Sequence, residues 1–127
     1  MRHIVVIITL LVLSAHGHVS AHEFTPTYPK LRPSFMPGIL QTEMKLFNAR
    51  NDVEYFGLSV FDGEWNAIPF ATETNIIRLK YLDRKKVNIY IREKDRNNAV
   101  YICSESKLLG RGTGLTMVKS KICSKIK

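Results

Sequence analysis

Apolar and polar residues alternate along much of the chain, and this alternation predicts short β-strands. The period of two residues is clearest in residues 40–46, 53–61 and 87–91. Such a period is typical of a strand with one face buried and one face in solvent. The expected inward-facing sets are Leu40, Thr42, Met44 and Leu46; Phe56, Leu58 and Val60; and Val87, Ile89 and Ile91.

Weaker patterns predict three more strands, at residues 75–79, 99–108 and 115–126. Polar turns separate the strands, including the Asp62-Gly63 dipeptide and a loop with Gly110, Gly112 and Gly114. No stretch has the 3.6-residue period of a helix. About seven short strands joined by frequent turns predict an all-β fold, a sandwich or a barrel.

Residues 1–21 have the features of a secretory signal peptide. Arg2 precedes an apolar run at residues 4–13, and Val19-Ser20-Ala21 supplies the small residues of a cleavage site. The run is shorter than the roughly 20 residues that span a bilayer. We expect cleavage after Ala21, no stable membrane span afterwards, and a periplasmic or extracellular location.

Removal of the signal peptide changes the chemistry that the chain can offer. His3, His16 and His18 leave with it, and His22 becomes the first residue. The one metal site left open is a chelate of the new terminal amine with the His22 imidazole. No cysteine or histidine cluster has zinc spacing, so no metal or cofactor is predicted.

The remaining chain divides into two parts. Residues 22–39 contain four of the five prolines and are expected to be an extended segment. Residues 40–127 are expected to form the β-sandwich. An exported protein with two cysteines is most simply explained by one disulfide, here Cys103–Cys123.

The last two predicted strands fit one antiparallel register. With Cys103 opposite Cys123, Glu105 faces Lys121 and Leu108 faces Val118. The expected core-facing residues are then Ile102, Leu108, Val118, Ile122 and Ile126. Tyr101, both cysteines, Glu105 and the lysines of the last strand fall on the outer face.

The outer face of this hairpin is basic. The chain carries a formal net charge of +8, and no acidic residue follows Glu105. A basic strand face can bind an anionic partner, or it can protect a sheet edge from aggregation. The candidate binding residues are Lys119, Lys121, Lys125 and Lys127. Nucleic acid is a weak candidate because the spacing lacks aromatic stacking platforms.

Catalytic motifs are missing from the expected mature chain. It has no internal histidine for a serine or cysteine nucleophile, and its glycines do not match a phosphate-binding loop. Asp62 and Glu64, beside Trp65, are the remaining pair of acids, and a glycosidase needs two carboxylates. We therefore expect a protein that is not an enzyme and keep a glycan-acting enzyme as an alternative.

Several short motifs occur in an order that suggests a family. They are Met44-Lys45-Leu46-Phe47-Asn48, Pro69-Phe70, Ile76-Ile77-Arg78-Leu79 and Asp95-Arg96 before Val100-Tyr101-Ile102. This order resembles the N-terminal immunoglobulin-like domain of periplasmic pilus chaperones. The resemblance implies an immunoglobulin-like β-sandwich of about seven strands. Arg32 and Lys119 are the candidates for that family's functional basic pair. The lysine-bearing last strand departs from the family's apolar one, so chaperone function does not follow.

A second resemblance covers the whole chain. The opening His22-Glu23-Phe24-Thr25-Pro26-Thr27-Tyr28-Pro29, the segment Tyr101-Ile102-Cys103-Ser104 and the ending Ile122-Cys123-Ser124-Lys125-Ile126-Lys127 look like small uncharacterised proteins of marine bacteriophages. The leading hypothesis is an exported, non-catalytic β-sandwich that binds a protein partner or an anionic surface. The alternative implied by this resemblance is a virion or assembly component that acts through sheet-edge contacts.

Overall fold

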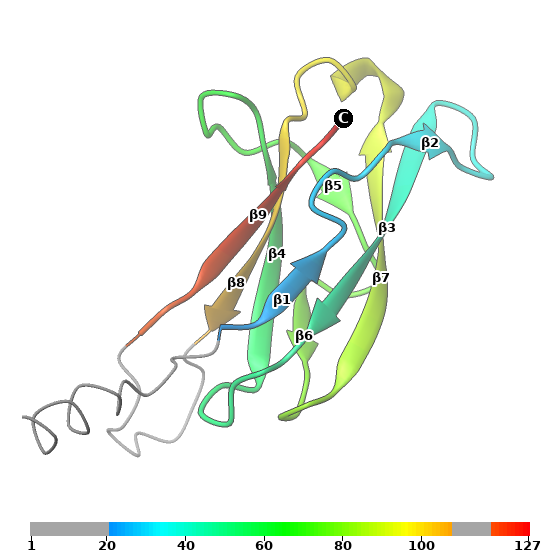
Figure 1. The fold of residues 1–127 in the computed structure, drawn as a ribbon. Coiled ribbons are helices and arrows are strands. Elements are labelled where there is room, and N and C mark those ends of the chain that lie inside the picture. Colours follow the sequence, from blue (N-terminus) through cyan, green and yellow to red (C-terminus); the bar gives the residue numbers. More distant parts are fainter. Residues whose placement is uncertain (1–20, 108–117) are drawn as a thin grey trace, which may run out of the picture.

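A computed structural model describes residues 21–107 and 118–127 (Figure 1). Residues 1–20 of the expected signal peptide and the predicted glycine loop lie outside the described residues. Within these two ranges, no helix is both long and apolar enough for a bilayer crossing. The elements are β1 (Glu23–Thr25), β2 (Arg32–Pro33), β3 (Ile39–Phe47), β4 (Tyr55–Phe61), β5 (Phe70–Ala71), β6 (Ile76–Arg78), β7 (Arg84–Arg92), the 3₁₀ turn η1 (Glu93–Asp95), β8 (Tyr101–Lys107) and β9 (Lys121–Lys125).

These strands form two antiparallel sheets packed face to face (Figure 1). Sheet A has the order β1-β3-β7-β5, and β2 also pairs with β3. Sheet B has the order β6-β4-β8-β9. The predicted all-β sandwich is therefore confirmed. The six strands that were predicted with residue ranges correspond to β3, β4, β6, β7, β8 and β9.

The core lies between the inner faces of the two sheets. Every residue of the three predicted inward-facing sets is buried, and Met44, Phe56 and Ile89 are fully enclosed. Within sheet A, the inward-facing set of β3 lies beside the inward-facing set of β7; Leu40, for example, pairs with Ile91. The β4 set covers them from sheet B. Burial of these alternating side chains stabilises the sandwich by about 1.5–3 kcal/mol for each large apolar group.

The proline-rich segment of residues 22–39, predicted as a separate extended stretch, is part of the sandwich. Its strands β1 and β2 both pair with β3, and Phe24 and Leu31 enter the core. The segment also contacts sheet B, where the backbone N–H of Lys125 donates to the carbonyl of Thr27 at 3.0 Å. It therefore closes one side of the gap between the two sheets (Figure 1).

Candidate functional site

The outer face of sheet B is built from rows of side chains on neighbouring strands. One row holds Phe61, Tyr101 and Lys125, from β4, β8 and β9. The next holds Ser59 and the two cysteines, and the third holds Gly57, Glu105 and Lys121. Because side chains alternate along a strand, all three rows point away from the core.

The predicted disulfide and its register are confirmed. Cys103 and Cys123 are bonded and lie directly opposite each other, with their Cα atoms 4.1 Å apart. On either side of β9, the N–H of Ile126 donates to the carbonyl of Val100 and the N–H of Ser106 donates to the carbonyl of Ser120, so the hydrogen-bonded pairs of this ladder are the even-numbered ones. The cysteines are therefore a non-hydrogen-bonded pair, the closer kind of pair that suits a disulfide.

One detail of the predicted hairpin is wrong, and another needs explanation. Cys103 lies on the outer face, as predicted, yet it is fully buried there. Val118, which was expected in the core, is 60% exposed. Val118 lies before β9 begins at Lys121, so the strand alternation does not yet fix its direction. The predicted position of Leu108 lies outside the described residues.

Cys103 is buried because side chains cross above the disulfide. The ammonium of Lys121 is 4.3 Å from the ring centroid of Phe61. Lys121 and Phe61 stand in the rows on either side of the cysteine row, so the lysine chain passes over the disulfide. The predicted opposition of Glu105 and Lys121 holds in the register, yet Glu105 pairs instead with Lys107 at 2.9 Å. This hydrogen bond is the main reason that the pKa of Glu105 lies below its usual value.

An aromatic cluster adjoins the disulfide. The Trp65 indole stacks on the Tyr101 ring with centroids 4.5 Å apart and planes within 3° of parallel. Phe61 lies 5.8 Å from Trp65, and the Lys121 ammonium lies 5.4 Å from the indole centroid. Trp65 remains 53% exposed. We call these three rings, with Lys121 and Lys125, the aromatic–lysine face.

The loop after β4 holds Trp65 in place. Trp65 has a φ of 67°, in the left-handed region that bulky residues rarely adopt. Asp62 fixes the loop, because its carboxylate accepts hydrogen bonds from the backbone N–H groups of Glu64 and Asn66 and from the Asn66 side chain. An unfavourable backbone conformation kept by a dense set of hydrogen bonds is a feature of functional sites.

The same hydrogen bonds bear on the acid pair that the sequence singled out. Those from Asn66 stabilise the charged form of Asp62, so its pKa lies below the usual value. A glycosidase general acid needs a raised pKa, so the shift is in the opposite direction. Glu64 lies exposed beside it. The hydrogen bonds of the Asp62 carboxylate show that this side chain holds the loop after β4 together.

The four predicted lysines lie in three different places. Lys121 and Lys125 lie on the outer face of sheet B. The ammonium of Lys127 lies 5.9 Å from the Tyr28 ring, towards the N-terminal segment. Lys119 is exposed just before β9. Arg32 pairs with Gln41 near the start of β3. Lys119 follows Val118, whose carbonyl accepts a hydrogen bond from Arg50 in the loop after β3. Arg32 and Lys119 therefore lie at opposite ends of the sandwich. They form no basic pair.

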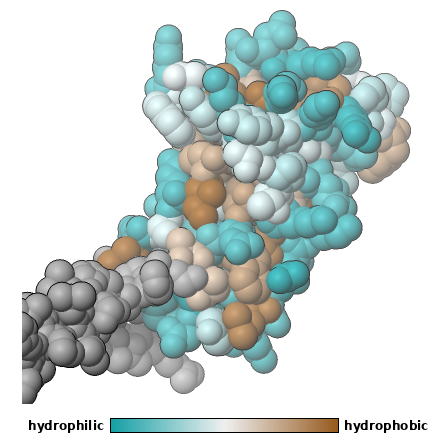
Figure 2. Space-filling model, in the orientation of Figure 1, coloured by the Kyte–Doolittle hydropathy of each residue, from teal (hydrophilic) through white to brown (hydrophobic). Residues whose placement is uncertain are grey.

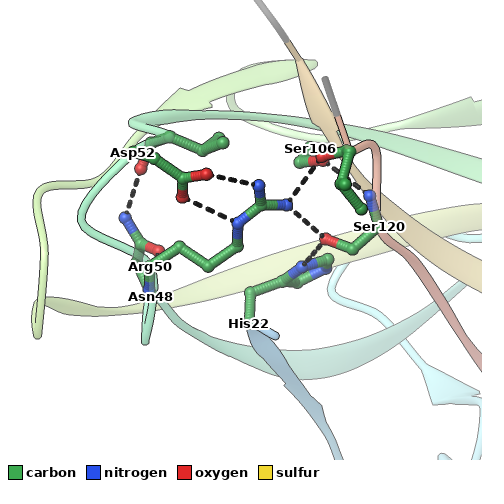
Figure 3. Close-up of polar contacts among 8 residues, drawn as sticks. His22, Asn48, Arg50, Asp52, Ser106 and Ser120 are labelled. Carbon is green, nitrogen blue, oxygen red and sulfur yellow. Dashed lines mark hydrogen bonds and ion pairs between the residues drawn. The ribbon is translucent and has the colours of Figure 1, made fainter. Parts of the chain in front are cut away.

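A buried polar network positions the start of β9 (Figure 3). Arg50 forms two hydrogen bonds with the Asp52 carboxylate, at 2.9 and 2.7 Å, and donates to the carbonyl of Val118 at 3.0 Å. Ser120 contacts both Arg50 and the Nδ1 of His22. The network therefore joins the loop after β3, the start of β9 and the residue before β1.

His22 is enclosed within this network. Its Nε2 lies 2.8 Å from the hydroxyl of Ser104, and its ring packs 4.8 Å from Phe56. The pKa of His22 is lowered, mainly by burial. A hydrogen bond with Ser104 raises this pKa, and the nearby charge of Arg50 lowers it. Both ring nitrogens are engaged by serine hydroxyls. Among residues 21–107 and 118–127, no cluster of three metal-ligating side chains occurs.

The free edge of β9 is partly covered. The N–H groups of Lys125 and Lys127 donate to the carbonyls of Thr27 and Pro29. A strand added at this edge would have to displace the N-terminal segment along that half. On the outer face of sheet B, by contrast, Trp65 is half-exposed.

Comparison with protein-family models gives no match, and neither does comparison with curated protein sequences. Among solved structures, the fold is similar to the crystal structure of the E. coli chaperone DraB, with a TM-score of 0.61 and 12% identity. The similarity covers 84% of this chain and 53% of that chain, so this chain spans about half the length of DraB. The fold that the pilus-chaperone resemblance implied, an immunoglobulin-like β-sandwich, is therefore the fold of this chain.

Proposed function

We propose that this chain is an exported, non-catalytic β-sandwich that binds a protein partner through the aromatic–lysine face. The observation that carries the proposal is the Trp65–Tyr101 stack with the Lys121 ammonium beside it. Trp and Tyr are common anchors of protein interfaces. A lysine beside them can steer an acidic partner to the site. The disulfide supports an extracytoplasmic location.

The chemistry of this face favours a partner segment that combines an apolar group with an acidic one. The indole of Trp65 is half-exposed and offers a stacking surface. Lys121 and Lys125 would attract a carboxylate, because Glu105 is already paired with Lys107. The tight loop around Asp62 holds the anchor in place before binding, which lowers the entropy that binding costs.

Pull-down from the extracytoplasmic proteins of the source cells tests this proposal. Trp65→Ala should weaken binding of the partner by about thirtyfold or more, since interface anchors are typically worth about 2 kcal/mol or more. Tyr81→Ala is the matched control, because Tyr81 is 52% exposed and lies in the turn between β6 and β7. Equal capture by both variants would disprove the assignment of the face.

The lysines can be tested separately. Lys121→Gln combined with Lys125→Gln should weaken capture and reduce its dependence on salt. Lys80→Gln combined with Lys85→Gln removes the same charge from exposed positions outside the aromatic–lysine face. If both double variants lose binding equally, net charge rather than this face attracts the partner.

A further inference from the structure

The hairpin between β2 and β3 exposes apolar side chains in a fixed conformation. Phe35 is 79% exposed and Met36 is 41% exposed. The turn is closed by the N–H of Ser34, which donates to the carbonyl of Ile39 at 2.9 Å, and by the Ser34 hydroxyl, which contacts the backbone of Met36. Gly38, at a φ of 74°, supplies the left-handed turn. The two side chains therefore project from a rigid tip.

This tip stands at one end of the sandwich, on the edge of sheet A (Figure 1). In Figure 2 apolar atoms mark the right-hand edge of the molecule at this place, beside hydrophilic residues. The Phe35 ring makes an edge-on contact with Tyr90 on the outer face of β7. Phe35 and Met36 would lower their free energy by entering an apolar medium.

A groove of about 470 Å³ lies on the same outer face, next to the tip. It is lined by Lys30 and Arg32 of the N-terminal segment, by Gln41 of β3 and by Asn88 of β7. Gln41 pairs with Tyr90, the residue that Phe35 contacts, so the groove and the tip are neighbours. The groove thus offers two cations and two side-chain amides within reach of the apolar tip.

The charges around the tip favour an anionic surface. Glu43 in the groove is paired with Lys86, and Asp95 beside the hairpin is paired with Arg92. In the described part of the chain, Lys30, Arg32, Lys94 and Arg96 form no ion pair, and Glu93 is the one acidic neighbour without such a partner. The uncompensated charge next to Phe35 and Met36 is therefore positive.

We propose that this end of the molecule docks on a membrane surface that contains anionic phospholipids. Phe35 and Met36 enter the headgroup layer, and Lys30 and Arg32 bind lipid phosphates at the groove. An apolar tip combined with basic side chains supplies the two weak contributions that reversible membrane binding needs. This site is on the outer face of sheet A and is independent of the aromatic–lysine face of sheet B.

Co-sedimentation with vesicles tests the proposal. The purified protein should bind vesicles of phosphatidylcholine mixed with phosphatidylglycerol, and bind vesicles of phosphatidylcholine alone at least about tenfold more weakly. Phe35→Ser combined with Met36→Ser should lower binding roughly tenfold. Tyr81→Ser combined with Leu82→Ser is the matched control, because that exposed apolar pair lies in another turn, between β6 and β7.

The basic groove is tested in the same assay. Lys30→Gln combined with Arg32→Gln should weaken binding to anionic vesicles about tenfold, whereas Lys80→Gln combined with Lys85→Gln should change it much less. Trp65→Ala should leave vesicle binding unchanged, which separates this proposal from the proposed protein interface. Thermal unfolding of each variant verifies that it is folded. Absence of binding to anionic vesicles, or equal losses in test and control variants, would overturn the proposal.

Discussion

At the scale of single residues, His22 links the stability of the fold to pH. Its imidazole is 2% exposed, and burial keeps its pKa below the usual value of about 6.5. The folded state therefore favours the neutral ring, while the unfolded chain takes up a proton more readily. Stability rises with pH wherever the unfolded state binds more protons.

We expect the free energy of unfolding to fall as pH decreases below about 6.5, down to the lowered pKa of folded His22. His22→Gln should remove this dependence, because glutamine does not titrate and can still contact Ser104 or Ser120. Urea unfolding between neutral and mildly acidic pH measures the effect. Glu105, whose pKa is also lowered, contributes in a separate and more acidic range. An unchanged pH profile in the variant would contradict this account of the network.

At the scale of strands, the alternation of apolar residues was enough to predict the long elements. β3, β4 and β7 each carry a full inward-facing set, so the sequence contains their signal. β1, β2 and β5 were not predicted, because each has only two or three residues and lies at or beside a proline. β6 is equally short, but it lies in the apolar stretch of residues 76–79. Such short strands exist through their pairing with distant partners, and local periodicity does not report that pairing.

The C-terminal hairpin shows the same limit. The disulfide and the cross-strand register were predictable from the positions of the two cysteines and from the alternation of inward- and outward-facing residues. The burial of Cys103 was not, because it depends on Lys121 reaching across to Phe61. Ser104 and Ser106 also face the core, where they meet His22 and Ser120. The alternation along β8 predicts that both serines face inward, but their polar partners come from other parts of the chain.

The disulfide should be the main covalent support of β9. Cys103→Ser combined with Cys123→Ser should lower the free energy of unfolding by about 3 kcal/mol, since the cysteines are 20 residues apart in sequence. Urea unfolding of both chains measures the difference. Ser59→Ala, in the same row of sheet B, is a control for loss of a small polar side chain. A double variant as stable as the native chain would show that packing alone holds β9.

At the scale of the whole molecule, the two faces of the sandwich carry different chemistry. Sheet B presents stacked aromatic rings with lysines, and sheet A presents a basic groove beside an apolar tip. The basic hairpin was predictable from the lysine spacing. The aromatic cluster was not, because Phe61, Trp65 and Tyr101 meet only once β4 and β8 are paired. The available signal was Trp65, two residues after the Asp62-Gly63 turn dipeptide.

The most direct test of the aromatic–lysine face is photocrosslinking in the cells that make the protein. A benzoylphenylalanine at position 64 lies next to Trp65 without replacing a residue of the aromatic–lysine face, and the same group at position 85 lies on β7 in sheet A. The account predicts a discrete protein adduct from position 64, lost with Trp65→Ala and kept with Tyr81→Ala. No adduct from position 64, or an equal yield of the same adduct from position 85, would contradict it.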